Sequence, residues 1–393
     1  MGNNPSNAQE DQVYSQIGGD ITPLNALRTR DSYESPTNSS ISRNSSQNFQ
    51  PIITQGKKSD FSAIWSSQVP DPPTPIARAA QCYVYDSFTN QIFIAYGMDN
   101  HQKYLNDCWS LNLSTLKWNL FKQELLSPRC YATALLITNF QSREMFIFGG
   151  YNGFQYFSDL HSINLDNGQI TCYDTTASPR QSALLFASPT SIFIYSGYNG
   201  TELRSFTEYN IQTRECINTE IVDFRGRSAA SFVESYDKVH WFVFGDTIGH
   251  PLLRFDNKTK QFNEMSCAGF GPPANLKNAL ICCADHYLFV TGGQKDSPYT
   301  YVYGLDIDRQ TWLVFSIQPD GETVTNSDGC VKNGNFQVPR SHSGVMAYSP
   351  STRSLMSVMG NRYTEPPPVQ IVYIGDALSV LHLKSDILYM LSL

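Results

Sequence analysis

Short runs of aromatic and aliphatic residues recur along the chain, and each ends in a turn that usually carries glycine. There are six runs: FIAYG at 93–97, FIFGG at 146–150, FIYSG at 193–197, FVFGD at 242–246, FVTGG at 289–293 and MSVMG at 356–360. A short apolar run bounded by a turn is typical of a strand that is buried on both faces. Alternating segments follow the runs, most clearly at 107–113 and 159–165, and predict a further strand in each repeat.

The spacing of these runs is nearly regular. Their last residues are separated by 53, 47, 49, 47 and 67 residues, so only the final interval departs from a period near 50. An arginine precedes the run in most repeats, and a bulky residue usually closes each repeat. The arginines are Arg78, Arg129, Arg180, Arg227 and Arg340, and the closing residues are Trp118, Tyr173, Cys216, Phe262, Trp312 and Tyr389. A fixed period of this length predicts a repeat architecture.

The order of Pro-Arg, apolar run, Gly-Gly, Asp-aliphatic strand and Trp resembles the kelch repeat. The second repeat matches best, because Arg129, Gly149, Gly150, Asp159 and Leu160 are all in place. The resemblance implies an all-β fold, a six-bladed kelch-type β-propeller, over residues 59–393. Each blade is then a four-stranded antiparallel sheet, and the stacking of blades buries both of its faces.

Three repeats depart from the kelch pattern. Asp246 replaces the second glycine in the fourth repeat, and the sixth repeat has a single glycine. The fifth repeat offers Ala274 or Lys277 where the others have arginine.

The sequence leaves open how the ring closes. The sixth repeat looks complete, with an alternating strand at 378–383 and an outer strand at 387–393. Residues 61–65 (FSAIW) also resemble an outer strand, with Trp65 placed before Arg78 much as Trp118 precedes Arg129. Residues 61–65 either pair beside the last blade and close the ring, or cap the propeller from outside. A seventh, degenerate blade is a third alternative.

Residues 1–58 differ in composition from the rest of the chain. They are rich in Asn, Ser, Gln and Pro, which predicts a disordered arm. The first six residues, MGNNPS, fit the acceptor pattern for N-myristoylation of Gly2. A single myristoyl chain binds membranes only weakly, so we expect membrane contact to be weak at most.

Charge and motif content exclude several function classes. The net charge of −7 is spread along the chain without a basic stripe, which argues against nucleic-acid binding. The nine cysteines include no C-x-x-C pair, and the seven histidines form no metal-binding spacing. The chain opens on polar residues without an apolar signal segment, so we expect a cytoplasmic protein with reduced thiols. Because the sequence contains no catalytic motif, we expect no enzyme activity, no cofactor and no metal.

The five repeat arginines are the candidate partner-binding residues. Symmetry should place Arg78, Arg129, Arg180, Arg227 and Arg340 in a ring around the channel mouth. In one interpretation they bind a protein partner there, and an acidic or phosphorylated peptide suits the paired donors of arginine. In the other, each guanidinium donates to strand carbonyls within its own blade. Two insertions, at 318–335 and 361–368, are further candidates for partner contacts.

These observations predict a binding module. The leading hypothesis is a non-catalytic protein–protein interaction scaffold or adaptor, for example in a cytoskeletal or ciliary assembly. The alternative is the substrate-recognition subunit of a ubiquitin ligase, and a propeller-fold hydrolase or oxidase is a remote third.

Overall fold

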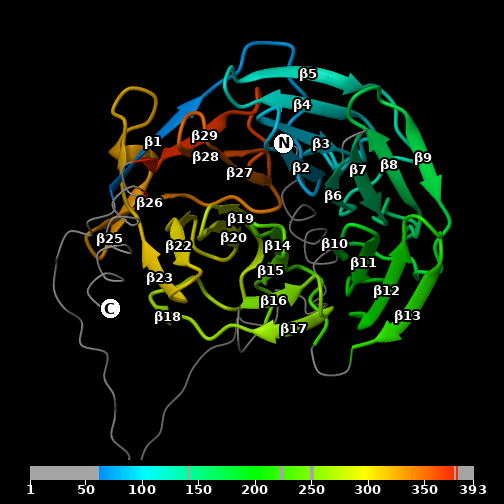
Figure 1. Cartoon of the computed structure of the whole chain (residues 1–393). Coiled ribbons are helices and arrows are strands. Elements are labelled where there is room, and N and C mark those ends of the chain that lie inside the picture. The colour runs from blue at the N-terminus through cyan, green and yellow to red at the C-terminus, as the bar shows by residue number, and fades with distance from the viewer. Residues whose placement is uncertain (1–61, 140–141, 222–224, 248–251, 376–377, 379–393) are drawn as a thin grey trace, which may run out of the picture. The chain divides into compact units, whose positions relative to one another are not determined.

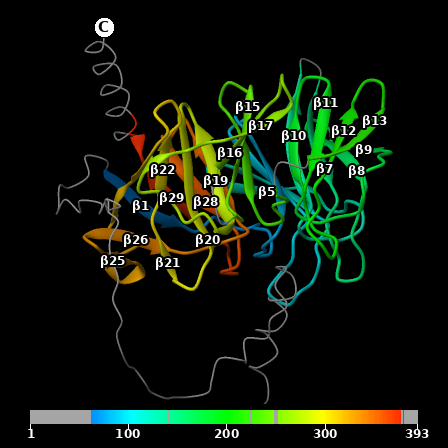
Figure 2. The ribbon, with the colours of Figure 1, turned by 90° about the horizontal axis from the view of Figure 1, so that it is seen from below.

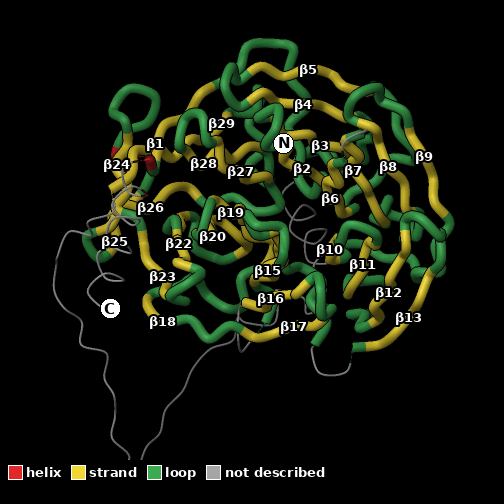
Figure 3. The backbone as a smooth tube through the Cα atoms, in the orientation of Figure 1, coloured by secondary structure: helices red, strands yellow, loops and turns green. Residues whose placement is uncertain are grey.

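The computed structural model describes residues 62–139, 142–221, 225–247, 252–375 and 378. The strands are arranged in small sheets around a central axis, as in a β-propeller (Figure 1). Figure 3 shows how strands dominate the regular structure of the described residues, which also include the short 3-10 helix η1 (Asn326–Asp328). The predicted arm at 1–58, with Gly2, lies outside the described residues, so its disorder and its lipidation stay predictions.

Four sheets share one plan, in which four antiparallel strands follow one another in sequence order. The first blade contains β2 (Cys82–Asp86), β3 (Gln91–Ala95), β4 (Cys108–Asn112) and β5 (Lys117–Lys122). The second contains β6 (Thr133–Thr138), β7 (Arg143–Phe148), β8 (Leu160–Asn164) and β9 (Ile170–Tyr173). The third contains β10 (Leu184–Ala187), β11 (Ser191–Tyr195), β12 (Ser205–Asn210) and β13 (Cys216–Glu220). The fourth contains β14 (Ser231–Glu234), β15 (His240–Phe244), β16 (Leu252–Asp256) and β17 (Gln261–Glu264).

Two further sheets carry a fifth strand. The fifth blade contains β19 (Lys277–Ala284), β20 (Tyr287–Gln294), β22 (Tyr303–Asp306) and β23 (Thr311–Val314), with β18 (Ala268–Gly269) parallel to β23. The last blade contains β27 (Val345–Ser349), β28 (Ser354–Val358), β29 (Val369–Tyr373), β1 (Ser62–Gln68) and β24 (Ser316–Pro319). The predicted apolar runs form the second strand of each blade, and in the second and third blades these strands are almost wholly buried.

The N-terminal strand closes the ring. β1 pairs antiparallel with β29, where Trp65 lies opposite Val372, and parallel with β24, where Trp65 lies opposite Pro319. Of the alternatives left open by the sequence, pairing beside the last blade is therefore the one observed. The third strand of the last blade is β29. Of the strand predicted at 378–383 only Leu378 is described, and the segment 387–393 with Tyr389 lies outside the described part of the chain.

The prediction of six blades is corrected by the structure, whose described residues form seven sheets. The additional sheet has three strands, β21 (Tyr299–Thr300), β26 (Asn335–Pro339) and β25 (Cys330–Lys332). Figure 2, which shows the ring from its edge, places these strands toward one face. Phe336 and Val338 of β26 share an apolar cluster with Trp65 and Phe315, so this sheet fills the space between the fifth and last blades. The sequence missed it because the polar stretch at 318–335 lacks the arginine and glycine signals of a repeat.

A belt of backbone hydrogen bonds joins neighbouring blades. Five N–H groups donate across blade boundaries over 2.7–3.0 Å, and all five donors have positive φ. The bonds run from Ala80 to Ser343, Tyr131 to Ala80, Ser182 to Tyr131, Asn278 to Ala229 and Ser343 to Asn278. At the fourth blade, the Ala229 N–H instead donates to Oδ2 of Asp246 at 3.0 Å. The residue that breaks the glycine pattern there thus supplies a replacement acceptor.

Candidate functional site

Three of the predicted site arginines lie buried between strands. Arg78, Arg129 and Arg180 are each at most 2% exposed. The Nε of each donates to the carbonyl two residues earlier, over 2.9–3.0 Å. Each Nη1 donates, over a similar distance, to the carbonyl where the second strand of the same blade ends. Arg227, which is 4% exposed, makes the equivalent bond to the Gly245 carbonyl at 3.3 Å.

Carboxylates partner the first two arginines. Nη2 of Arg78 donates to Asp107 at 3.1 Å, and Nη1 of Arg129 donates to Asp159 at 2.7 Å. Burial alone would raise the pKa of Asp107, but its hydrogen bond and its attraction to Arg78 hold that pKa below the usual value. The guanidinium of Arg180 donates to carbonyls and a serine hydroxyl, and burial lowers its pKa to about 10.

Arg340 does not occupy the predicted position in the last blade. Its Nη1 donates to the Gly292 carbonyl at 2.7 Å, so it serves the fifth blade, which has no arginine of its own at this place. The N–H of the turn glycine in the first and second blades donates to the next repeat arginine, Gly97 to Arg129 and Gly150 to Arg180. In the fifth blade, Gly293 donates instead to Ser341. Ser341, one residue beyond Arg340, therefore holds the arginine position of the last blade.

The contacts of all five arginines are those of groups that tie strands together. Four are buried, and Arg340 is half-buried and donates to four backbone carbonyls. Partner binding by these residues at the channel mouth stays a prediction, and their mutants can separate the two roles.

The central channel is wide and lined by the innermost strands. Its volume is about 1220 Å³, and its wall includes Tyr83, Tyr131, Phe232 and Tyr348. Glu234 lies on the same wall, and burial raises the pKa of its carboxyl to about 7. The channel therefore combines aromatic surface with an acid that titrates near neutral pH.

Aromatic side chains gather on the loops of the first three blades. Tyr151 and Tyr156 pack with ring centroids 4.8 Å apart, and Tyr156 meets Tyr198 edge-on at 6.3 Å. Tyr104 of the first blade lies beside Gly153 of the same group of loops. Phe154 stands at the tip and is 95% exposed. Each of these loops joins the second and third strands of its own blade. Because the three blades are neighbours, the loops share one face of the propeller. We call these five residues the aromatic face.

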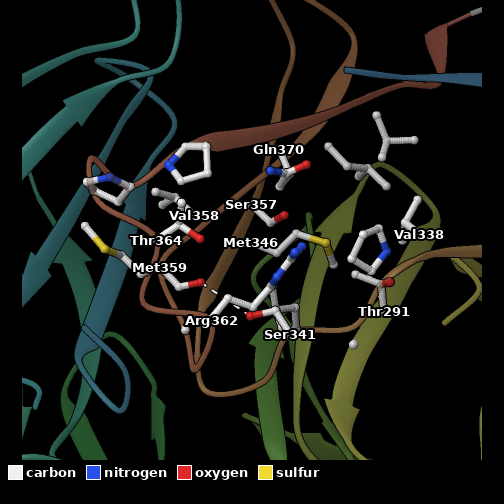
Figure 4. A pocket seen from close by; sticks show the side chains of 18 of the residues that line it. Thr291, Val338, Ser341, Met346, Ser357, Val358, Met359, Arg362, Thr364 and Gln370 are labelled. Atoms are coloured by element: carbon white, nitrogen blue, oxygen red, sulfur yellow. Dashed lines mark hydrogen bonds between the residues drawn. The ribbon is translucent and has the colours of Figure 1, made fainter. Parts of the chain in front are cut away.

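The predicted insertion at 361–368 lies over a cavity between the fifth and last blades (Figure 4). Arg362 and Thr364 of this loop line the cavity together with Met346, Ser357 and Val338. A second, more polar cavity adjoins the first, because Pro339 and Arg362 line both. The insertion is therefore part of a built pocket.

Two of the histidines, His161 and His342, have partners that indicate a structural role. His342, half-buried, has Nδ1 3.1 Å from the Ser343 hydroxyl, and burial lowers its pKa to about 4. His161 is fully buried, with Nε2 2.9 Å from the Tyr96 hydroxyl. Within the described ranges, no group of three or more His, Cys, Asp or Glu side chains is placed to hold a metal ion. In the same ranges, no helix has the length and apolar character needed to cross a membrane.

Comparison with protein families agrees with this geometry. A family model described as the KLHDC2/KLHL20/DRC7 Kelch-repeats domain matches residues 60–246. Over these residues the chain is similar to a kelch-repeat domain. The match covers the ring-closing strand β1 and the first three blades, and it ends at Asp246, just after the second strand of the fourth blade. A search of curated proteins found no match to the chain. The resemblance inferred from the glycine and arginine pattern is confirmed.

Proposed function

We propose that this kelch propeller is a non-catalytic scaffold or adaptor that binds protein partners through the aromatic face. The observation that carries the proposal is the position of Phe154, which is 95% exposed on the same group of loops as the four tyrosines of that face.

Two physical arguments support protein binding by this face. Tyrosine and phenylalanine are enriched in protein interfaces, where a large ring with few rotatable bonds buries much area at little entropic cost. The loops that carry the rings are anchored at both ends by paired strands. Tyr151 and Tyr198 are further fixed by isolated bridges to Cys130 and Gln181. The surface is therefore largely formed before a partner arrives, which lowers the cost of binding.

The kelch domain is typically an interaction module, and we propose a cytoplasmic cytoskeletal or ciliary assembly as its setting. A role as the substrate-recognition subunit of a ubiquitin ligase is the alternative. The partners themselves distinguish the two proposals, because one predicts structural proteins and the other predicts ligase subunits.

Affinity capture from native lysate, followed by quantitative mass spectrometry, tests the proposal. Phe154→Ala should reduce recovery of the specific partners about tenfold or more, the effect of losing one interface hot spot. Phe88→Ala is a matched control, because Phe88 is 89% exposed on the β2–β3 turn at the opposite end of the sheets. Equal recovery by wild type and Phe154→Ala would refute binding through the aromatic face.

A further inference from the structure

The cavity beneath the 361–368 loop is an apolar slot between two blades. Its volume is about 80 Å³, and its wall includes Val302, Val338, Met346 and Leu355. A water molecule needs roughly 10–15 Å³ by such a measure, so this slot has room for a small branched alkyl group. Figure 4 shows Ser357 and Met346 around the space and Arg362 extending into it from the loop.

The adjoining cavity is a polar vestibule of about 420 Å³. Lys295, Arg340 and Arg362 line it and face a single carboxylate, Asp328. His342 also lines the vestibule, but with a pKa lowered to about 4 by burial it is neutral at physiological pH. The vestibule is therefore positive although the protein as a whole carries a net charge of −7.

Arg362 joins the two spaces. Its side chain is exposed, and within the described ranges it makes no ion pair and no side-chain hydrogen bond. Asp328, whose pKa is lowered mainly by hydrogen bonds from the backbone N–H and the hydroxyl of Thr325, also attracts Arg362. This differs from the repeat arginines, whose guanidinium groups are held by carbonyls. A cation at the rim of an apolar slot is arranged to accept an anionic group attached to an apolar one.

We propose that this site binds a peptide segment in which a side chain of valine or leucine size adjoins Asp or Glu. The apolar side chain enters the slot, and the carboxylate pairs with Arg362 in the vestibule. The inference rests on the proposed protein-binding function, and it names a second site, away from the aromatic face, together with the chemistry of its partner.

Methionine-methyl NMR provides a direct test with the whole protein. Met346 and Met359 line the slot, whereas Met145 is buried in the second blade and serves as an internal reference. The probe is acetyl-Asp-Leu-Gly-amide, whose blocked ends leave one carboxylate. We expect its titration to shift the Met346 and Met359 signals saturably and to leave the Met145 signal in place. Two control peptides should produce much smaller shifts. Acetyl-Lys-Leu-Gly-amide lacks the carboxylate, and acetyl-Asp-Gly-Gly-amide lacks the apolar side chain.

Two substitutions test the two halves of the site. Arg362→Ala should weaken the probe about tenfold or more, the range for a charge-assisted hydrogen bond, and Arg362→Lys should restore part of the loss. Ser357→Leu should fill the slot and abolish the shifts while the protein still melts in one transition. Arg204→Ala, a change at an exposed arginine of the third blade, should leave binding unchanged. Shifts that persist in both Arg362→Ala and Ser357→Leu, or that the Lys-Leu probe reproduces, would overturn the proposal.

The outcome is separable from that of the proposed function. If partners are captured through the aromatic face but the probes produce no shifts, the slot is not a binding site and the scaffold proposal stands. If the probe binds as described but Phe154→Ala changes no captured partner, the slot proposal stands and the aromatic face is excluded.

Discussion

Replacement of Trp65 by alanine tests whether the N-terminal strand holds the ring together. Trp65 is 3% exposed and packs against Phe336, with ring centroids 6.0 Å apart. Its Nε1 donates to Oε1 of Gln370 at 2.8 Å, and its carbonyl accepts from the Asp320 N–H. One side chain thus contacts the last blade and the additional sheet at once.

The expected loss is large because the ring leaves a cavity and an acceptor loses its donor. Truncation of a buried tryptophan to alanine costs about 3–5 kcal/mol. The entropy of unfolding is about 2.1 cal/mol/K per residue, or roughly 0.6 kcal/mol/K for about 300 ordered residues. Trp65→Ala should therefore lower the Tm by about 5–8 °C.

Calorimetry of the full chain measures this shift, and two variants control it. Trp65→Phe keeps the ring contact with Phe336 and loses the hydrogen bond to Gln370, so it should cost about 1–2 kcal/mol. Phe154→Ala removes an aromatic ring that is 95% exposed and should leave the Tm within about 1 °C. A Tm for Trp65→Ala equal to that of Phe154→Ala would refute ring closure by β1.

Three further predictions concern the repeat residues and the channel. Arg129→Ala should lower the free energy of unfolding in urea by about 2–4 kcal/mol, because buried acceptors lose their donor; unchanged stability with weaker binding of an acidic peptide would instead favour the partner-binding role. Gly149→Ala should lower the free energy of unfolding by about 2 kcal/mol more than Gly168→Ala, because a Cβ at Gly149 would lie 2.4 Å from the Arg180 carbonyl oxygen. Gly168 also has a positive φ but has open space around it, so equal losses in the two variants would contradict close packing at Gly149. Glu234 has a folded-state pKa near 7, above its value of 4.5 in an unfolded chain, so the folded protein holds this proton more tightly and stability should fall as pH rises from about 4.5 to 7. Glu234→Gln should flatten that decline in Tm, and an unchanged slope would exclude Glu234 as its source.

The sequence predicted well those parts of the fold in which the same residue types recur at the same position of each repeat. FIFGG at 146–150 needs a strand buried on both sides and a turn with positive φ, and β7 with Gly149 and Gly150 supplies both. The sequence also marked residues 61–65 as an outer strand. It could not place them, because pairing between β1 and β29 joins residues about 300 positions apart and leaves no local signal.

The errors arose where a residue has a different structural role from the equivalent residues of the other repeats. Arg340 follows a proline and precedes an apolar run, as Arg129 does, yet a shift of one residue places Ser341 in the arginine position. That shift depends on the length of the chain between β26 and β27, which the motif does not record. The sequence predicted an insertion at Arg362 but not the pocket beneath it. The apolar wall of that pocket comes from strands of two different blades, and the repeat pattern describes each blade by itself.

The boundary between the third and fourth blades is held by different interactions from the other blade boundaries. Among the described belt positions, Ala229 alone donates to a side chain, so this boundary lacks the backbone bond found at the others. Aromatic packing is correspondingly dense there: Phe186 stacks on Phe255 with centroids 4.7 Å apart, and Trp241 Nε1 donates to the Ala187 carbonyl at 3.3 Å. Stacked rings contribute about 0.5–1.5 kcal/mol beyond their buried area, comparable to one hydrogen bond. The degenerate fourth repeat is therefore compatible with a closed propeller. Side-chain contacts at this boundary supply the stabilisation that a backbone hydrogen bond supplies at the other boundaries.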